Sequence, residues 1–156
     1  LPAGEVYLAP LEGTANGKLV LEWAPTRALE SPVTVIIKDG LVKEVSGDVV
    51  DSTLREEYAA YLKAKISERK ENANIAELGI GTNDMAKRPD NILESEKISG
   101  TIHIAFGDNS SFGGNVSTPF HQDFVFFRPT VTLIDKNGKK TILMKDGRFA
   151  MSSFRT

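Results

Sequence analysis

Short apolar runs separated by turn residues dominate the chain, and this pattern predicts strands rather than helices. Asp39-Gly40 and Lys136-Asn137-Gly138 each lie between two such runs, as is typical of β-hairpins. Asn16-Gly17 carries the same hairpin signal between the first two runs. The predicted strands cover residues 4–10, 18–23, 32–38, 41–45, 75–82, 100–107, 120–128, 130–134 and 140–144.

One segment instead has the periodicity of a helix. Thr53 to Glu56 matches a capping box, in which a hydroxyl and a carboxylate satisfy the first free amides of a helix. Because strands and helices do not alternate along the chain, we expect an α+β fold with a mostly antiparallel or mixed sheet and one main helix at about residues 53–70. The apolar positions that share one face of this helix are Leu54, Tyr58, Tyr61, Leu62 and Ile66.

Length and composition limit the class of protein. The 156 residues suffice for one domain with its own core, and 40% apolar with 26% charged residues fit a globular protein. The net charge of −2 argues against a broad basic face for nucleic acid or anionic lipid, and no apolar stretch is long enough for a membrane helix. The absence of cysteine excludes disulfides, thiolate zinc sites, iron–sulfur clusters and cysteine nucleophiles.

The candidate chemistry lies where polar side chains interrupt apolar strands. His121 and Asp123 are two residues apart, so their side chains point to the same face of a strand and form a pair of the metal-ligand type. The alternative is an ordinary hydrogen bond on an exposed face. The pair also fits the facial triad of non-haem iron oxygenases, but that triad needs a distal His later in the chain, and none follows His121.

Three further polar residues stand inside apolar strands: His103, Glu77 and Glu5. A lone histidine inside a strand, such as His103, is more often a core residue whose ring nitrogens are hydrogen-bonded. For Glu77, the alternative to a metal-ligand role is a structural salt bridge. The two imidazoles and three carboxylates offer nitrogen and oxygen ligands without sulfur, a set that suits Zn, Co or Mn. Five ligands are too many for one catalytic zinc but fit two divalent metal ions that share a carboxylate.

These residues belong to a longer series of motifs between positions 4 and 123: Gly4-Glu5-Val6, Ala76 to Asn83, Glu96 to Gly107, Gly113-Gly114-Asn115 and His121-Gln122-Asp123. In order and spacing, the series resembles the aminopeptidase T (AmpS-type, thermophilic) metalloaminopeptidases. The resemblance implies that residues 1–156 are a single metal-binding catalytic domain, a fragment that lacks an N-terminal α/β domain. The chain begins with Leu1 rather than Met, which leads to the same expectation. The implied metal ligands are Glu5, Glu77, His103, His121 and Asp123.

The implied reaction is removal of N-terminal residues from peptides by a water molecule that two metals activate. Glu96, an acid in the matching segment before His103, is the candidate for proton transfer, and an exposed ion pair with Lys97 is its alternative. Many relatives have a Tyr shortly after the His103-type residue. Here positions 108–111 read Asp-Asn-Ser-Ser, so Asp108 or Asn109 is a candidate replacement.

The resemblance also implies a peptide substrate, a homodimer and the missing N-terminal domain as partners. We expect a cytoplasmic location, with which the lack of cysteine is compatible. A second reading belongs to a different class of protein: a non-catalytic β-rich module for binding or dimerisation, with a lapsed or structural metal site.

Overall fold

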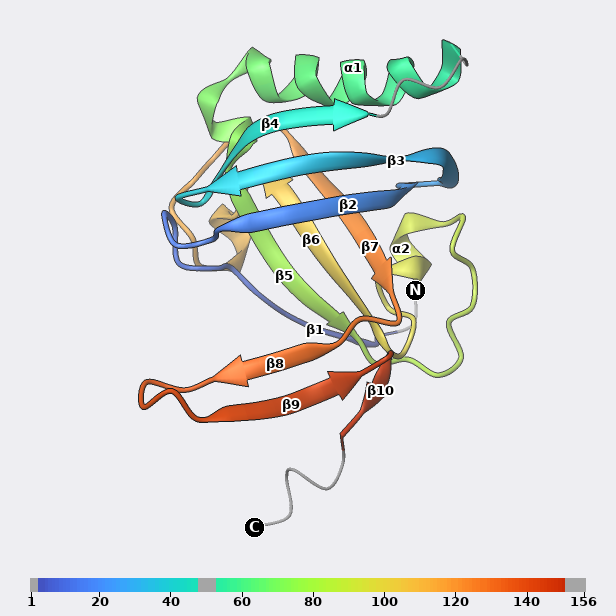
Figure 1. The fold of residues 1–156 in the computed structure, drawn as a ribbon, viewed down its shortest axis with the longest axis vertical. Coiled ribbons are helices and arrows are strands. Elements are labelled where there is room, and N and C mark those ends of the chain that lie inside the picture. The colour runs from blue at the N-terminus through green and yellow to red at the C-terminus, as the bar shows by residue number, and fades with distance from the viewer. Residues whose placement is uncertain (1–2, 48–52, 151–156) are drawn as a thin grey trace.

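The computed structural model describes residues 3–47 and 53–150, and for residues 53–57 it describes the backbone alone. The described residues form three antiparallel sheets (Figure 1). The largest has the order β1-β5-β6-β7 and consists of β1 (Glu5–Leu8), β5 (Ile75–Gly81), β6 (Thr101–Gly107) and β7 (His121–Phe127). The second joins β2 (Gly17–Ala24), β3 (Arg27–Lys38) and β4 (Leu41–Gly47). The third joins β10 (Arg148–Phe149), β9 (Lys140–Lys145) and β8 (Val131–Ile134).

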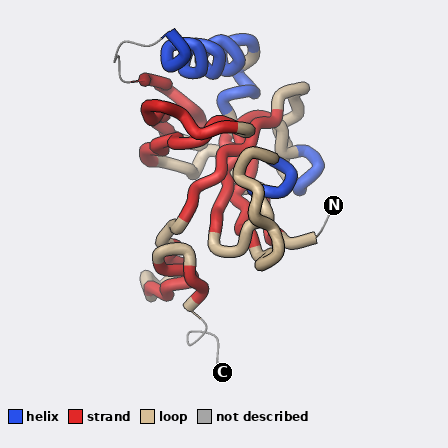
Figure 2. Tube along the Cα trace, turned by 90° about the vertical axis from the view of Figure 1, so that its right-hand side faces the viewer, coloured by secondary structure: helices blue, strands red, loops and turns tan. Residues whose placement is uncertain are grey.

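Two α-helices occur in the described residues: α1 (Thr53–Glu68) and the short α2 (Ile92–Ser95). Two 3₁₀ turns, η1 (Lys70–Ala73) and η2 (Ser110–Phe112), complete the elements. Figure 2 shows α1 as a layer on the second sheet, with the third sheet at the far end of the molecule beyond the largest one. Neither described helix is long and apolar enough to cross a membrane.

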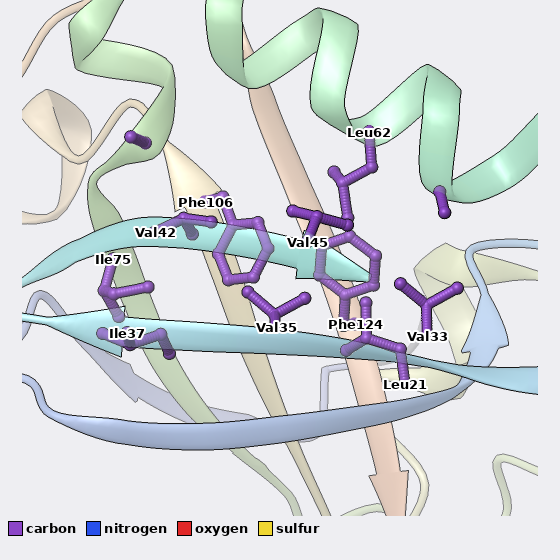
Figure 3. Packing of buried hydrophobic residues seen from close by; sticks show 12 residues of the cluster. Leu21, Val33, Val35, Ile37, Val42, Val45, Leu62, Ile75, Phe106 and Phe124 are labelled. Carbon is purple, nitrogen blue, oxygen red and sulfur yellow. The ribbon is translucent and has the colours of Figure 1, made fainter. Parts of the chain in front are cut away.

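The hydrophobic core lies between the first two sheets and under α1 (Figure 3). Phe106 of β6 and Phe124 of β7 pack with ring centroids 4.9 Å apart and face Val35 of β3. Leu62 of α1 closes this cluster from above and is fully buried. Because side chains alternate along a strand, the neighbours of these phenylalanines point to the opposite face of the largest sheet, which the core does not cover.

The structure confirms the α+β class, the main helix and the two hairpins at Asp39-Gly40 and at residues 136–138. In the helical stripe, Leu62 is buried and Tyr58 and Ile66 pack against the core, but Tyr61 is 44% exposed. Leu54 and the capping box lie outside the described side chains. The segment 83–97, which reads as loop from its polarity, contains the one-turn helix α2.

The hairpin predicted at Asn16-Gly17 is wrong. β1 pairs with β5, whereas β2 pairs with β3, so the first two strands belong to different sheets. Asn16 instead accepts a hydrogen bond from the amide of Asp39 (3.0 Å), and the carbonyl of Ala15 accepts one from Gly40 (2.8 Å). The Asn-Gly pair therefore ties the loop after β1 to the β3–β4 turn instead of forming a turn of its own.

Candidate metal centre

Four neighbouring strands bring the candidate ligands to the face of the largest sheet that the core leaves uncovered. The register pairs Glu77 of β5 with Ala105 of β6, and Ala105 with Asp123 of β7. Only a methyl group therefore stands between the two carboxylates. One row further, Gly79 pairs with His103 and also with Tyr7 of β1.

Glu77 lies at the centre of the cluster and contacts both histidines. Its Oε1 is 3.1 Å from Nε2 of His103, and its Oε2 is 3.4 Å from Nε2 of His121. Each imidazole nitrogen has a second carboxylate nearby. Asp123 Oδ1 lies 3.5 Å from Nε2 of His121, and Glu5 Oε2 lies 3.7 Å from Nε2 of His103. The structure thus brings the five predicted ligand residues into one cluster.

Within this cluster, Glu77, His121 and Asp123 form a candidate metal triad. One ligand atom from each lies within 4.8 Å of the other two. Asp123 Oδ1 is buried and has no hydrogen-bond partner among the described residues, and the same holds for Nδ1 of His103. At 3.5 Å, His121 Nε2 makes an ion-pair contact with this oxygen but no hydrogen bond, so a cation would compensate the buried carboxylate better, and the residues present fit a divalent metal.

The charges of the cluster are strongly coupled. Burial raises the pKa of the Glu77 carboxyl, but hydrogen bonds and positive charge from the two imidazoles outweigh it and hold that pKa at about 2. Burial lowers the pKa of His121, but Asp123 and Glu77 raise it to about 10. The pKa of His103 is raised as well, because Glu77 and nearby carboxylates outweigh its burial. In the metal-free protein, the imidazoles of the cluster therefore hold protons at the place where a metal ion would bind.

Two features outside the ligand set orient the histidines. His121 donates from Nδ1 to the backbone carbonyl of Asp108 (2.8 Å), which turns Nε2 toward Glu77 and Asp123. The His103 ring lies directly over Gly79, where an added Cβ would overlap the imidazole. The absence of a side chain at Gly79 thus lets the ring cross β5.

Glu96 lies beside the cluster and is paired with Lys97. The pair is not exposed, since the two side chains are 12% and 10% accessible. Lys97 also contacts Oε1 of Glu5 at 3.1 Å, so its ammonium group holds the carboxylate whose other oxygen faces His103. Burial raises the pKa of Glu96, Lys97 opposes that rise, and Asp123 and Glu5 add to it. The expected ion pair is present, but in buried rather than exposed form.

Sequence reasoning missed Lys97, because a lysine beside a glutamate ordinarily indicates a solvated surface. It also proposed Asp108 or Asn109 as a replacement for a tyrosine. The Asp108 carboxylate instead accepts hydrogen bonds from Ser110 and Thr118. Asn109 is fully buried and bonds Glu12 and the amide of Val116. Both side chains organise the loop, and the link from Asp108 to the site is its backbone carbonyl.

The facial triad of non-haem iron oxygenases needs a second His, and none follows His121 in the sequence. The structure removes that objection, because His103 precedes His121 in the chain and lies beside the same carboxylate of Glu77. Two imidazoles and a carboxylate are therefore present in one place, whatever their order along the chain.

Two solved structures share this fold. The 2,5-dihydroxypyridine dioxygenase from Pseudomonas putida KT2440 matches with a TM-score of 0.76 and 21% identity over 96% of this chain and 44% of that one. AmpT from Thermus thermophilus matches with a TM-score of 0.70 and 18% identity over 96% of this chain and 40% of that one. The resemblance to aminopeptidase T is thus supported at the level of the fold, and this chain spans less than half of either structure. No curated protein matches the sequence.

A family model gives a more specific assignment. It matches residues 1–150, which include all of the candidate ligands. The match extends over nearly the whole sequence and includes the metal-site face of the largest sheet together with the third sheet. The chain therefore belongs to the family described as NicX, 2,5-dihydroxypyridine 5,6-dioxygenase.

Proposed function

We propose that this chain is the metal-binding catalytic domain of a two-metal hydrolase that removes N-terminal residues from peptides. One observation carries the proposal: the two oxygens of Glu77 face two different histidines, and each histidine has a further carboxylate of its own. This is the arrangement expected of a carboxylate that bridges two cations. A single metal held by Glu77, His121 and Asp123 would leave His103 and Glu5 outside the ligand set.

The two ligand sets share Glu77 and otherwise have no residue in common. The first contains His103 and Glu5, and the second contains His121 and Asp123. Zn, Co or Mn would suit both sets, because all of the ligands are nitrogen or oxygen atoms. Such ions, when bound, polarise a carbonyl oxygen and lower the pKa of a water molecule between them.

Glu96 is the residue that we assign to proton transfer. A carboxyl group that exchanges protons near neutral pH needs a raised pKa, and burial together with nearby Asp123 and Glu5 raises that of Glu96. Lys97 holds the carboxyl in place through its ion pair. The peptide substrate, the homodimer, the N-terminal domain and the cytoplasmic location belong to the same proposal and rest on the resemblance to aminopeptidase T.

A second candidate function is ring-opening dioxygenation at one iron ion. It is favoured by the family to which the chain belongs and by the presence of two imidazoles and a carboxylate in one cluster. In this reading His103, His121 and a carboxylate hold a single Fe(II), and Glu5 serves only to hold Lys97.

Metal stoichiometry separates the two candidates. In the hydrolase, Glu5 is a ligand in one set only, so Glu5→Gln is expected to reduce bound Zn²⁺ or Co²⁺ from two ions per chain to one. Glu22→Gln, which changes an exposed carboxylate on β2, is the matched control and is expected to retain two. One ion per chain in both the wild type and Glu5→Gln would refute the two-metal centre.

Activity provides the second test. The wild-type chain, loaded with Co²⁺ or Zn²⁺, is expected to release the chromophore from aminoacyl p-nitroanilides, and a chelator should abolish the release. Loaded anaerobically with Fe²⁺ and then exposed to oxygen, it is not expected to consume oxygen with 2,5-dihydroxypyridine. Oxygen consumption without amide hydrolysis would favour the dioxygenase, and a chain that binds no metal would leave the non-catalytic module.

A further inference from the structure

Two aromatic rings, those of Tyr7 and Phe112, stand beside the candidate metal ligands. Tyr7 follows Glu5 by two residues on β1, so both side chains point to the same face of the sheet. The register places Tyr7 opposite Gly79, over which the His103 ring lies. Tyr7 is 51% exposed even though it is next to a buried cluster.

Phe112 links Tyr7 to a candidate metal ligand. Its ring packs edge-on against Tyr7, with centroids 5.5 Å apart and planes at 75°, and lies against the His121 imidazole with centroids 5.3 Å apart. A continuous row of three rings therefore runs from the edge strand β1 to a nitrogen donor of the cluster.

The core does not require these two rings. Neither Tyr7 nor Phe112 belongs to the hydrophobic cluster between the sheets in the described part of the chain. Phe112 is nevertheless held in a defined position. Glu12 accepts hydrogen bonds from Asn109 (3.1 Å) and from the amide of Asn115 (2.7 Å), which fixes both ends of the loop that carries it. An exposed tyrosine on a strand, packed against a half-buried phenylalanine on a pre-organised loop, is a feature of ligand sites.

We propose that Tyr7 and Phe112 form the wall of a ligand subsite next to the metal centre, and that this subsite takes the apolar side group of a small molecule whose polar end binds the metal. The inference rests on the metal centre of the proposed function. It specifies the substrate class, because substrates with an aromatic or branched aliphatic side group would bind more tightly than those with a small one.

Hydroxamates test the subsite without reference to the reaction, because a hydroxamate chelates a divalent metal whichever chemistry the centre performs. The probes are benzohydroxamate and acetohydroxamate, and calorimetry measures their Kd with the Co²⁺-loaded chain. The wild type is expected to bind benzohydroxamate at least about tenfold more tightly. Tyr7→Ala and Phe112→Ala should each reduce this preference by about three- to tenfold.

The matched control is Tyr61→Ala, which removes a similarly exposed tyrosine from α1 and should leave the preference unchanged. Tyr7→Phe keeps the ring, so it should retain the preference and thereby exclude a general loss of structure. If Tyr7→Ala and Phe112→Ala both keep the wild-type preference, the subsite is refuted while the metal centre stands. If a Co²⁺-loaded chain binds neither hydroxamate, or the chain takes up no Co²⁺, the metal centre fails and the subsite fails with it.

Discussion

Metal ions and protons compete for the same nitrogen atoms in this cluster, so metal affinity should rise steeply with pH. Contacts with Asp123 and Glu77 raise the pKa of His121 from 6.5 to about 10. At pH 7 the metal-free imidazole therefore carries a proton, and a metal ion can bind its Nε2 only after that proton leaves. The pKa of His103 is raised in the same direction.

The size of the pH effect on metal affinity follows from the difference between pH 7 and the pKa of His121. Each pH unit below that pKa weakens metal binding about tenfold for one displaced proton, so affinity at pH 7 should be about a thousandfold lower than near pH 10. If His103 also releases a proton, the slope steepens toward about a hundredfold per unit.

Calorimetric titration of the metal-free chain with Zn²⁺ measures this exchange directly. Repeating the titration at pH 7 in two buffers with different ionisation enthalpies counts the protons released, and at least one per chain is expected. A competing chelator then gives the affinity between pH 6.5 and pH 8.5. Binding that releases no proton, or an affinity that does not change over this range, would show that the imidazoles are not the ligands.

Two further predictions concern the space that Gly79 leaves for the His103 ring and the pH dependence of stability in the metal-free protein. Gly79→Ala places a methyl group in the His103 imidazole, so it should remove the metal ion that His103 and Glu5 hold, whereas Gly47→Ala, whose Cβ meets only an ordinary contact at 3.5 Å, should retain that ion in the same calorimetric assay. The low pKa of Glu77, about 2, adds stability above its ordinary value of 4.5 that is lost as the pH falls toward 2. The high pKa of His121, about 10, adds stability below 6.5 that is lost as the pH rises toward 10. The Tm of the chelator-treated chain should therefore peak between pH 4.5 and 6.5, and a Tm that keeps rising up to pH 9 would contradict this balance of charges.

Strand alternation made much of the site predictable. A carboxylate such as Glu77, or an imidazole such as His103, stands out inside an apolar strand, and the two-residue spacing of His121 and Asp123 places both on one face. The convergence of these residues depends on strand register, which a single sequence does not specify. The pairing of Ala105 with Glu77 on one side and with Asp123 on the other arises from hydrogen bonds between separate strands of the chain.

Other features were hidden because tertiary contacts override local signals. Lys97 reads as a surface residue, yet Glu5 and Glu96 neutralise its ammonium group and allow its burial. Asn16-Gly17 has the composition of a hairpin turn, yet its hydrogen bonds go to the β3–β4 turn. In both cases one deciding partner, Glu5 for Lys97 and the β3–β4 turn for Asn16, is too distant in the sequence for a local pattern to reveal.

The position of Lys97 leads to a last prediction, that two metal ions would bind with unequal affinity. The ligand atoms of Glu77, His121 and Asp123 already lie within 4.8 Å of one another. The other ligand set depends on Glu5, whose Oε1 is 3.1 Å from the Lys97 ammonium group.

A cation that binds to His103 and Glu5 must share Glu5 with a buried positive charge, and the repulsion between like charges weakens its binding. Titration with Co²⁺ should therefore show a tighter and a weaker step, at least about tenfold apart. Glu5→Gln should remove the weaker step only. If that variant loses the tighter step instead, the first ion binds beside Lys97, and the order of occupancy inferred from the triad is wrong.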